Sequence, residues 1–149
     1  MKKLITTALV YGILGIVLEA AYRITNHYLF FEGVTTVTSI YAHMLILGLL
    51  FFLAVMALDT KYALVTARNF NAFFVTYNFG MLLAVGCLIW QAVYPLFKLT
   101  VPEWGPNTFF WVSVAGQFFL LIGLLFFFAA LYGRATKDGR DRVRARSKK

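Results

Sequence analysis

Residues 38–58, TSIYAHMLILGLLFFLAVMAL, decide the fold class. In this run His43 is the only side chain that can carry a charge near neutral pH. About 20 consecutive apolar residues are enough for an α-helix to cross the hydrocarbon core of a bilayer. We therefore interpret the stretch as a membrane span, and the question is what an imidazole does inside it.

The composition extends this interpretation to the whole chain. Hydrophobic residues make up 61% and charged residues 13% of the 149 positions, whereas soluble domains average about 45–50% and about 25%. Three further apolar runs lie at about 4–26, 69–95 and 107–133. Short connections favour antiparallel neighbours, so we predict an all-α integral membrane four-helix bundle, up-down-up-down, over residues 1–133. A β-barrel would require segments of about 10 residues in which apolar and polar side chains alternate, whereas these runs are longer and uniformly apolar.

A signal peptide is the alternative interpretation of the first apolar run, which begins MKKLITTALVYGILG. Its apolar region continues beyond the usual 7–15 residues of a signal core, and no clear cleavage site follows it. We interpret it as a retained helix.

The distribution of Lys and Arg predicts the orientation. Twelve of the 14 lie at the N-terminus, in the connection after the second span, or in the basic tail at 134–149. Because cytoplasmic loops are rich in Lys and Arg, both termini should be cytoplasmic. The tail could instead be a nucleic-acid arm, but attraction to anionic headgroups, worth about 1 kcal/mol per basic residue, explains it sufficiently. The expected partner is the lipid bilayer rather than nucleic acid.

Small residues predict where helices pack closely, since packing holds helices together in lipid. These residues are Gly12, Gly15 and Ala20 in the first span, Gly80, Ala84 and Cys87 in the third, and Gly116 and Gly123 in the fourth.

Polar side chains inside the spans are the candidate functional residues, because each is costly at membrane depth and normally turns inward. Glu19 and Arg23 are four residues apart on one helix face, where they can neutralise each other. With the predicted orientation, His43, Gln91 and Gln117 lie in the same outer half of the bundle. We predict that these five side chains form a buried polar cluster.

The alternative for each of these residues is an ordinary hydrogen bond between helices, worth about 0.6 kcal/mol on average. We prefer this alternative for Asn78 and Ser113, and we expect Tyr77 and Asn78 to cap or cross-link helices. A charged pair beside a titratable imidazole is a costly way to join helices, so a function for Glu19, Arg23 and His43 stays open.

A haem b between helices usually takes two axial ligands, commonly histidines. His43 is the candidate metal ligand, and the other histidine of the chain, His27, lies at the end of the first apolar run. A five-coordinate haem, a His/Met site with Met44 or Met81, and a haem shared across a dimer all remain open. Too few His, Asp and Glu residues are present for a three-ligand hydrolytic centre.

The segments LVYGILGIVLEAAYR, SIYAHMLILGLLFFLAVMALDTK, TYNFGMLL and VAGQFFLLIGLLFF resemble a family of small four-helix bacterial membrane proteins classed as a domain of unknown function. Members tend to have His-x-His at the place of Tyr41-Ala42-His43, and Gly-His at the place of Gly116-Gln117. The resemblance implies a bacterial plasma-membrane protein and, for the family, a haem site distantly similar to helices of haem-copper oxidase and nitric oxide reductase catalytic subunits. This chain keeps His43 and has Tyr41 and Gln117 at the other two places.

Two functions follow from these observations. The first is a non-enzymatic structural or partner-docking membrane module, for which the partner would be a second copy or another membrane subunit. The second is a redox protein that uses His43, with Gln117 opposite, to bind haem b or a quinone-like molecule. Transport is a third, weaker idea, because no internal repeat is evident.

Overall fold

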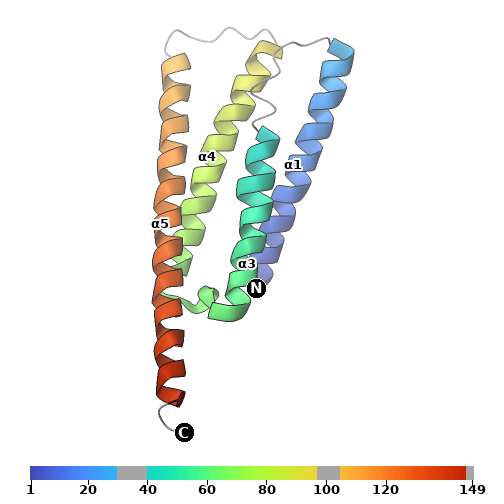
Figure 1. Ribbon diagram of the computed structural model, residues 1–149. Helices are drawn as coiled ribbons and strands as arrows, with labels where there is room; N and C mark the ends of the chain where they lie inside the picture. Colours follow the sequence, from blue (N-terminus) through green and yellow to red (C-terminus); the bar gives the residue numbers. More distant parts are fainter. Residues whose placement is uncertain (30–39, 97–104, 147–149) are drawn as a thin grey trace.

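The computed structural model describes residues 1–29, 40–96 and 105–146. This part of the chain is helical and contains no strand, which confirms the all-α class. Figure 1 shows the elements, and their bounds are α1 Lys2–Leu29, the π-helix η1 His43–Leu50, α3 Phe51–Tyr62, the short 3-10 helix η2 Leu64–Thr66, α4 Phe70–Leu96 and α5 Gly105–Arg146.

Four helical segments in the described residues are long and apolar enough to cross a membrane. They are Lys2–Ile24, Ile40–Tyr62, Phe70–Gln91 and Asn107–Arg140. Each exceeds the roughly 20 residues that a span requires. The second segment is continuous across η1 and α3, and the predicted residues 38 and 39 lie outside the described part.

The fourth helix is longer than predicted. The expected end was residue 133, where the apolar run stops, but α5 continues to Arg146. The tail contains no proline, and Arg, Lys and Ala are good helix formers. The helix therefore extends beyond its apolar part.

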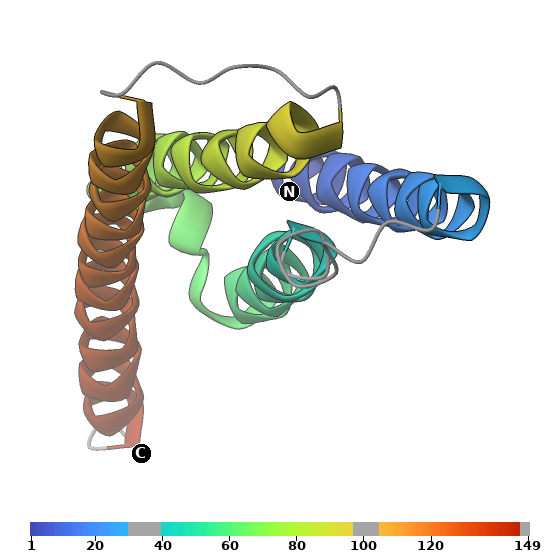
Figure 2. The same cartoon turned by 90° about the horizontal axis from the view of Figure 1, so that it is seen from above.

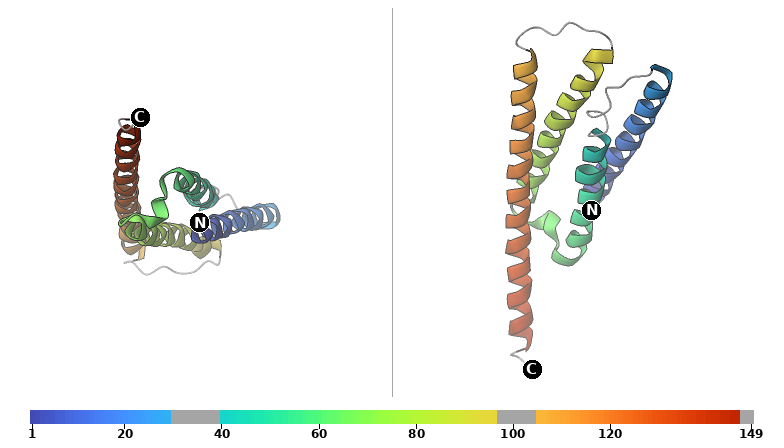
Figure 3. Two further views of the ribbon diagram at one scale, coloured as in Figure 1. Left: turned by 90° about the horizontal axis from the view of Figure 1, so that it is seen from below. Right: turned by 45° about the horizontal axis from the view of Figure 1, so that its top comes forward.

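The helices form two close pairs, α1 with η1 and α3, and α4 with α5, as the tilted view in Figure 3 shows. Between α4 and α5 the backbones touch at glycines. A Cβ added to Gly80 would lie 2.7 Å from the backbone nitrogen of Leu120, and one on Gly123 would lie 2.9 Å from the backbone of Tyr77. Any larger side chain would force the two helices apart, so the predicted glycine contacts on this pair are confirmed.

The other pair is closest at Gly48, where an added Cβ would lie 2.5 Å from the Cβ of Tyr11. Gly12 and Gly15 face leucine side chains of η1, as expected for a contact stripe. Ala20, which was predicted to continue this stripe, is exposed instead.

An aromatic cluster joins the two pairs toward the end of the array where the N-terminus lies. Phe51 stacks on Tyr77 with ring centroids 4.6 Å apart and packs edge-on against Phe127 at 5.6 Å. Phe52 and Phe73, both fully buried, complete the cluster. Seen from above, α3 lies inside the angle between α4 and α5 (Figure 2), so its aromatic side chains reach both partners.

Candidate functional site: a π-helix, a polar cross-link and a lateral groove

The π-helix η1 begins at His43, the residue that the sequence singles out. In a π-helix the backbone N–H bonds to the carbonyl five residues earlier, and such segments occur frequently at functional sites. At the end of η1 the N–H of Phe51 donates to the carbonyls of Ile46 and Gly48, so the carbonyl of Leu47 does not receive the bond that an α-helix would give it.

Tyr77 supplies the missing partner. Its hydroxyl crosses from α4 and donates to the Leu47 carbonyl at 2.9 Å. The Tyr77 side chain is 1% exposed and its ring stacks on Phe51, so the hydroxyl is held against this half-buried part of η1. A buried carbonyl without a partner would cost about 1–3 kcal/mol, and the tyrosine removes that cost.

A second polar contact links α1 to α4. The Tyr11 hydroxyl donates to Oδ1 of Asn78 at 2.8 Å, and Nδ2 of Asn78 donates to the carbonyl of Phe74 at 2.7 Å. Because Tyr11 also packs against Gly48, one side chain connects α1 with both η1 and α4. The prediction that Asn78 cross-links helices is therefore confirmed.

A groove of about 550 Å³ lies between α1 and α4 around this cross-link. One wall runs from Thr6 to Leu18 on α1 and the other from Asn78 to Ile89 on α4. The lining is mostly aliphatic, and several lining residues are exposed, so the groove opens sideways between the helices. Gly86 widens it, since a Cβ there would meet no atom within 4 Å.

The predicted polar cluster is only partly assembled. Glu19 and Arg23 form the expected ion pair, with Nη2 of Arg23 2.6 Å from Oε1 of Glu19. Arg23 is 75% exposed and lies near Tyr41 at the start of the second span. The pair therefore lies beside the segment that carries His43, which is half-buried.

The two glutamines behave differently from one another. Gln91 is half-buried and its side-chain nitrogen lies 3.5 Å from Sγ of Cys87, one turn earlier on α4. Gln117 is exposed, so the prediction that it points inward is wrong. The packed face of α5 at this level is carried by Gly116 and Leu120, which are buried, and Gln117 is on another face. Its part in binding a cofactor stays a prediction.

Within residues 1–29, 40–96 and 105–146, no three His, Cys, Asp or Glu side chains are grouped so that they could hold a metal ion. His43 as a haem ligand also stays a prediction.

Sequence reasoning missed Tyr11 and Leu47. Tyr11 looks like one more aromatic residue in an apolar run, and a backbone carbonyl has no signature in a sequence. The usable signal was Gly48, a glycine in the middle of a leucine run, which indicates close approach of a neighbouring helix.

The fold defines a class: the described part of the chain has four helices that are each long and apolar enough to cross a membrane, with a lateral groove between two of them. Residues 1–134 match the family described as Protein of unknown function (DUF2871), and the chain belongs to that family. Comparison with curated proteins and with solved structures gives no match. The similarity to helices of haem-copper oxidase and nitric oxide reductase subunits stays a prediction.

Proposed function

We propose that this protein is a multi-pass protein of the bacterial plasma membrane with both termini in the cytoplasm. The support is the excess of Lys and Arg at the N-terminus, after the second span and in the tail. The N-terminus and the basic end of α5 lie at the same end of the helix array in Figure 1, as this orientation requires.

We infer that it works as a non-enzymatic membrane module that docks a molecule with a long apolar chain, such as a lipid or an isoprenoid quinone, in the groove between α1 and α4. The observation that carries this proposal is the shape of the groove. Thr6 and Leu18, which mark the α1 wall, are about 18 Å apart along the helix axis. Dividing the volume by this length leaves a cross-section of about 30 Å².

This cross-section favours a thin occupant. An α-helix with its side chains is about 10–12 Å across and would lie over the open side of the groove rather than within it. A single hydrocarbon chain is much thinner than a helix and fits. The volume also lies within the roughly 300–1,000 Å³ of ordinary ligand pockets.

The polar groups in the groove support an apolar occupant. The Tyr11 hydroxyl donates to Oδ1 of Asn78, and Nδ2 of Asn78 donates to the carbonyl of Phe74. Thr6 and Thr7 bring hydroxyls to the end of the groove nearest the N-terminus. A chain with a small polar end therefore suits the groove better than a ligand with many polar atoms.

The test is extraction and mass spectrometry of molecules bound to the full chain after purification in mild detergent. Gly86→Leu puts a side chain into the groove at a position where its Cβ meets no atom within 4 Å. Gly139→Leu is the matched control, because a side chain there also meets open space and position 139 is outside the groove. We expect about one chain-bearing molecule per protein in the wild type and the control, and at least fivefold less in Gly86→Leu. Equal retention in all three, or a stoichiometric protein partner in place of the molecule, would refute the proposal.

One observation favours a second function, a haem b or quinone-like redox ligand at His43: the π-helix begins at that residue. Optical spectra of the oxidised and dithionite-reduced protein, purified from cells supplied with haem, test the haem form. A Soret band that is lost in His43→Ala supports it. A colourless protein removes haem and leaves the groove as the candidate site.

A further inference from the structure

A second pocket, of about 520 Å³, lies beside α5 at the end of the array where the N-terminus is found. Three basic side chains line it: Arg68 from the segment before α4, and Arg134 and Lys137 from α5. None of the residues that line this pocket is acidic. The pocket is separate from the groove between α1 and α4 and shares no lining residue with it.

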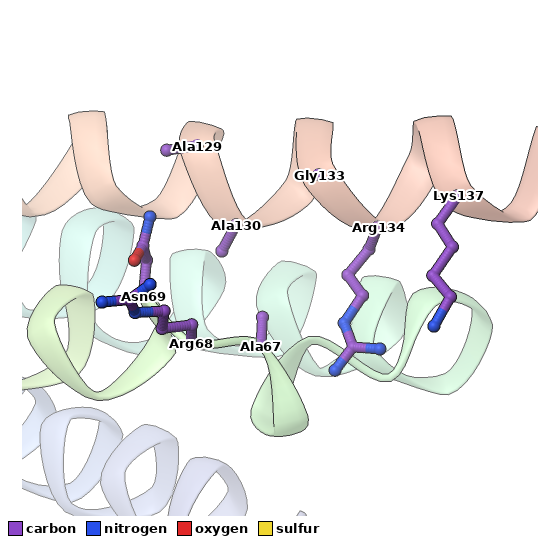
Figure 4. A pocket seen from close by; sticks show the side chains of 8 residues that line it. All are labelled: Ala67, Arg68, Asn69, Ala129, Ala130, Gly133, Arg134 and Lys137. Carbon is purple, nitrogen blue, oxygen red and sulfur yellow. The ribbon is translucent and has the colours of Figure 1, made fainter.

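The basic groups come from opposite walls. Figure 4 shows Arg134 and Lys137 directed from α5 toward the segment that carries Ala67 and Arg68, with Asn69 directed back toward α5. Arg134 is held in place because its Nη2 donates to Oγ1 of Thr66. Arg134 and Lys137 therefore enter the pocket from α5, while Arg68 lies on the opposite wall with its side chain directed toward Asn69 (Figure 4).

Small residues make the space between these walls. Ala67 faces Ala130 across the pocket in Figure 4, and Gly133 follows one turn later on α5. A Cβ on Gly133 would meet no atom within 4 Å. Larger side chains at these places would fill the volume next to Arg134.

We propose that this pocket binds the phosphate group of an anionic phospholipid from the cytoplasmic leaflet. Guanidinium groups bind phosphate oxygens in a paired geometry, and lysine adds a point charge. Basic pockets between membrane helices on the cytoplasmic side bind anionic headgroups. The pocket lies where the second and third spans meet, next to the last apolar turns of α5, at the depth of a headgroup in the orientation proposed above.

The experiment is native mass spectrometry of the full chain in detergent, titrated in separate arms with dioleoylphosphatidylglycerol, dioleoylphosphatidylcholine and inorganic phosphate. Arg134→Gln removes one charge from the pocket, and Gly133→Leu fills it without a change of charge. The matched controls are Arg140→Gln and Gly139→Leu, which make the same changes on α5 outside the pocket.

We expect phosphatidylglycerol to bind at least tenfold more tightly than phosphatidylcholine. Arg134→Gln should weaken it at least fivefold, because it removes a charge-assisted hydrogen bond to the phosphate in the pocket. Gly133→Leu should weaken it at least as much, and both controls should bind like the wild type. Equal binding of the two lipids, unchanged binding in both pocket variants, or equal losses in the controls would overturn the proposal. Displacement of the lipid by millimolar inorganic phosphate would assign the pocket to a free anion instead.

Discussion

Tyr77→Phe is the most informative single substitution, because it removes one hydroxyl and leaves the ring packing on Phe51 intact. The Leu47 carbonyl then loses its 2.9 Å hydrogen bond to a side chain that is 1% exposed. An unpaired buried acceptor costs about 1–3 kcal/mol, whereas hydrogen bonds between membrane helices average about 0.6 and reach about 1.7 kcal/mol. With Tyr77 1% exposed, we expect a loss of about 1.5 kcal/mol in the free energy of unfolding.

The backbone has one way to avoid this cost, which is to return η1 to the α-helical register so that Phe51 bonds to Leu47. That change of register would rotate Gly48 away from Tyr11 and put a residue with a side chain in its place. A Cβ at this place would lie only 2.5 Å from the Cβ of Tyr11, which is too close. We therefore expect the π-helix to persist and the carbonyl to stay unpaired.

The assay for Tyr77→Phe is an SDS unfolding titration in mixed micelles, with Tyr132→Phe as the control because Tyr132 is 74% exposed. Isotope-edited infrared spectroscopy of a ¹³C-labelled Leu47 carbonyl should show its band at higher frequency in the variant. The free energy of unfolding of Tyr77→Phe could instead lie within about 0.3 kcal/mol of the wild-type value, well below the average contribution of such a hydrogen bond. In that case the hydroxyl does not stabilise the π-helix.

Three further predictions concern the contacts around the site. Gly123→Ala should destabilise the fold by about 1–3 kcal/mol in the same SDS titration, because the new Cβ meets the backbone of Tyr77. Gly133→Ala is the control: its Cβ meets no atom within 4 Å, so the change should be neutral or stabilise the fold by up to about 1 kcal/mol. Tyr11→Phe should cost about 0.6 kcal/mol and at most about 1.7, and a larger loss would mean that the groove collapses as well. The backbone N–H of Val65 donates to Oδ1 of Asp59 at 2.8 Å, so Asp59→Ala should speed hydrogen exchange at the Val65 amide. Asp59→Asn keeps an acceptor oxygen and should keep this amide protected from exchange.

Apolar length and small residues made most of the fold predictable from the sequence. The four spans follow from runs of about 20 apolar residues, and Gly80, Gly116 and Gly123 indicated the tight packing of the last two helices. Hydropathy measures the part of a helix that suits lipid and not the whole helix, so it placed the end of α5 at residue 133 rather than at Arg146.

The candidate site was less predictable, because its features depend on contacts between distant residues. The π-helix is stabilised by Tyr77 of α4 and Tyr11 of α1, and neither residue is near His43 in the sequence. Gln117 was assigned to the wrong face because the run around it is apolar on all sides, and such a helix does not reveal which face packs. Glu19 and Arg23 were paired correctly since their spacing alone brings them together.

The central claim is that an apolar chain occupies the groove between α1 and α4. Photo-cross-linking tests it most directly: the full chain is reconstituted with a lipid that carries a diazirine in its acyl chain, irradiated, digested and mapped by mass spectrometry. We expect labels to concentrate on residues 6–18 and 78–89 and to fall at least fivefold in Gly86→Leu. Labels spread evenly over the exposed apolar residues of α5, with no change in Gly86→Leu, would contradict it.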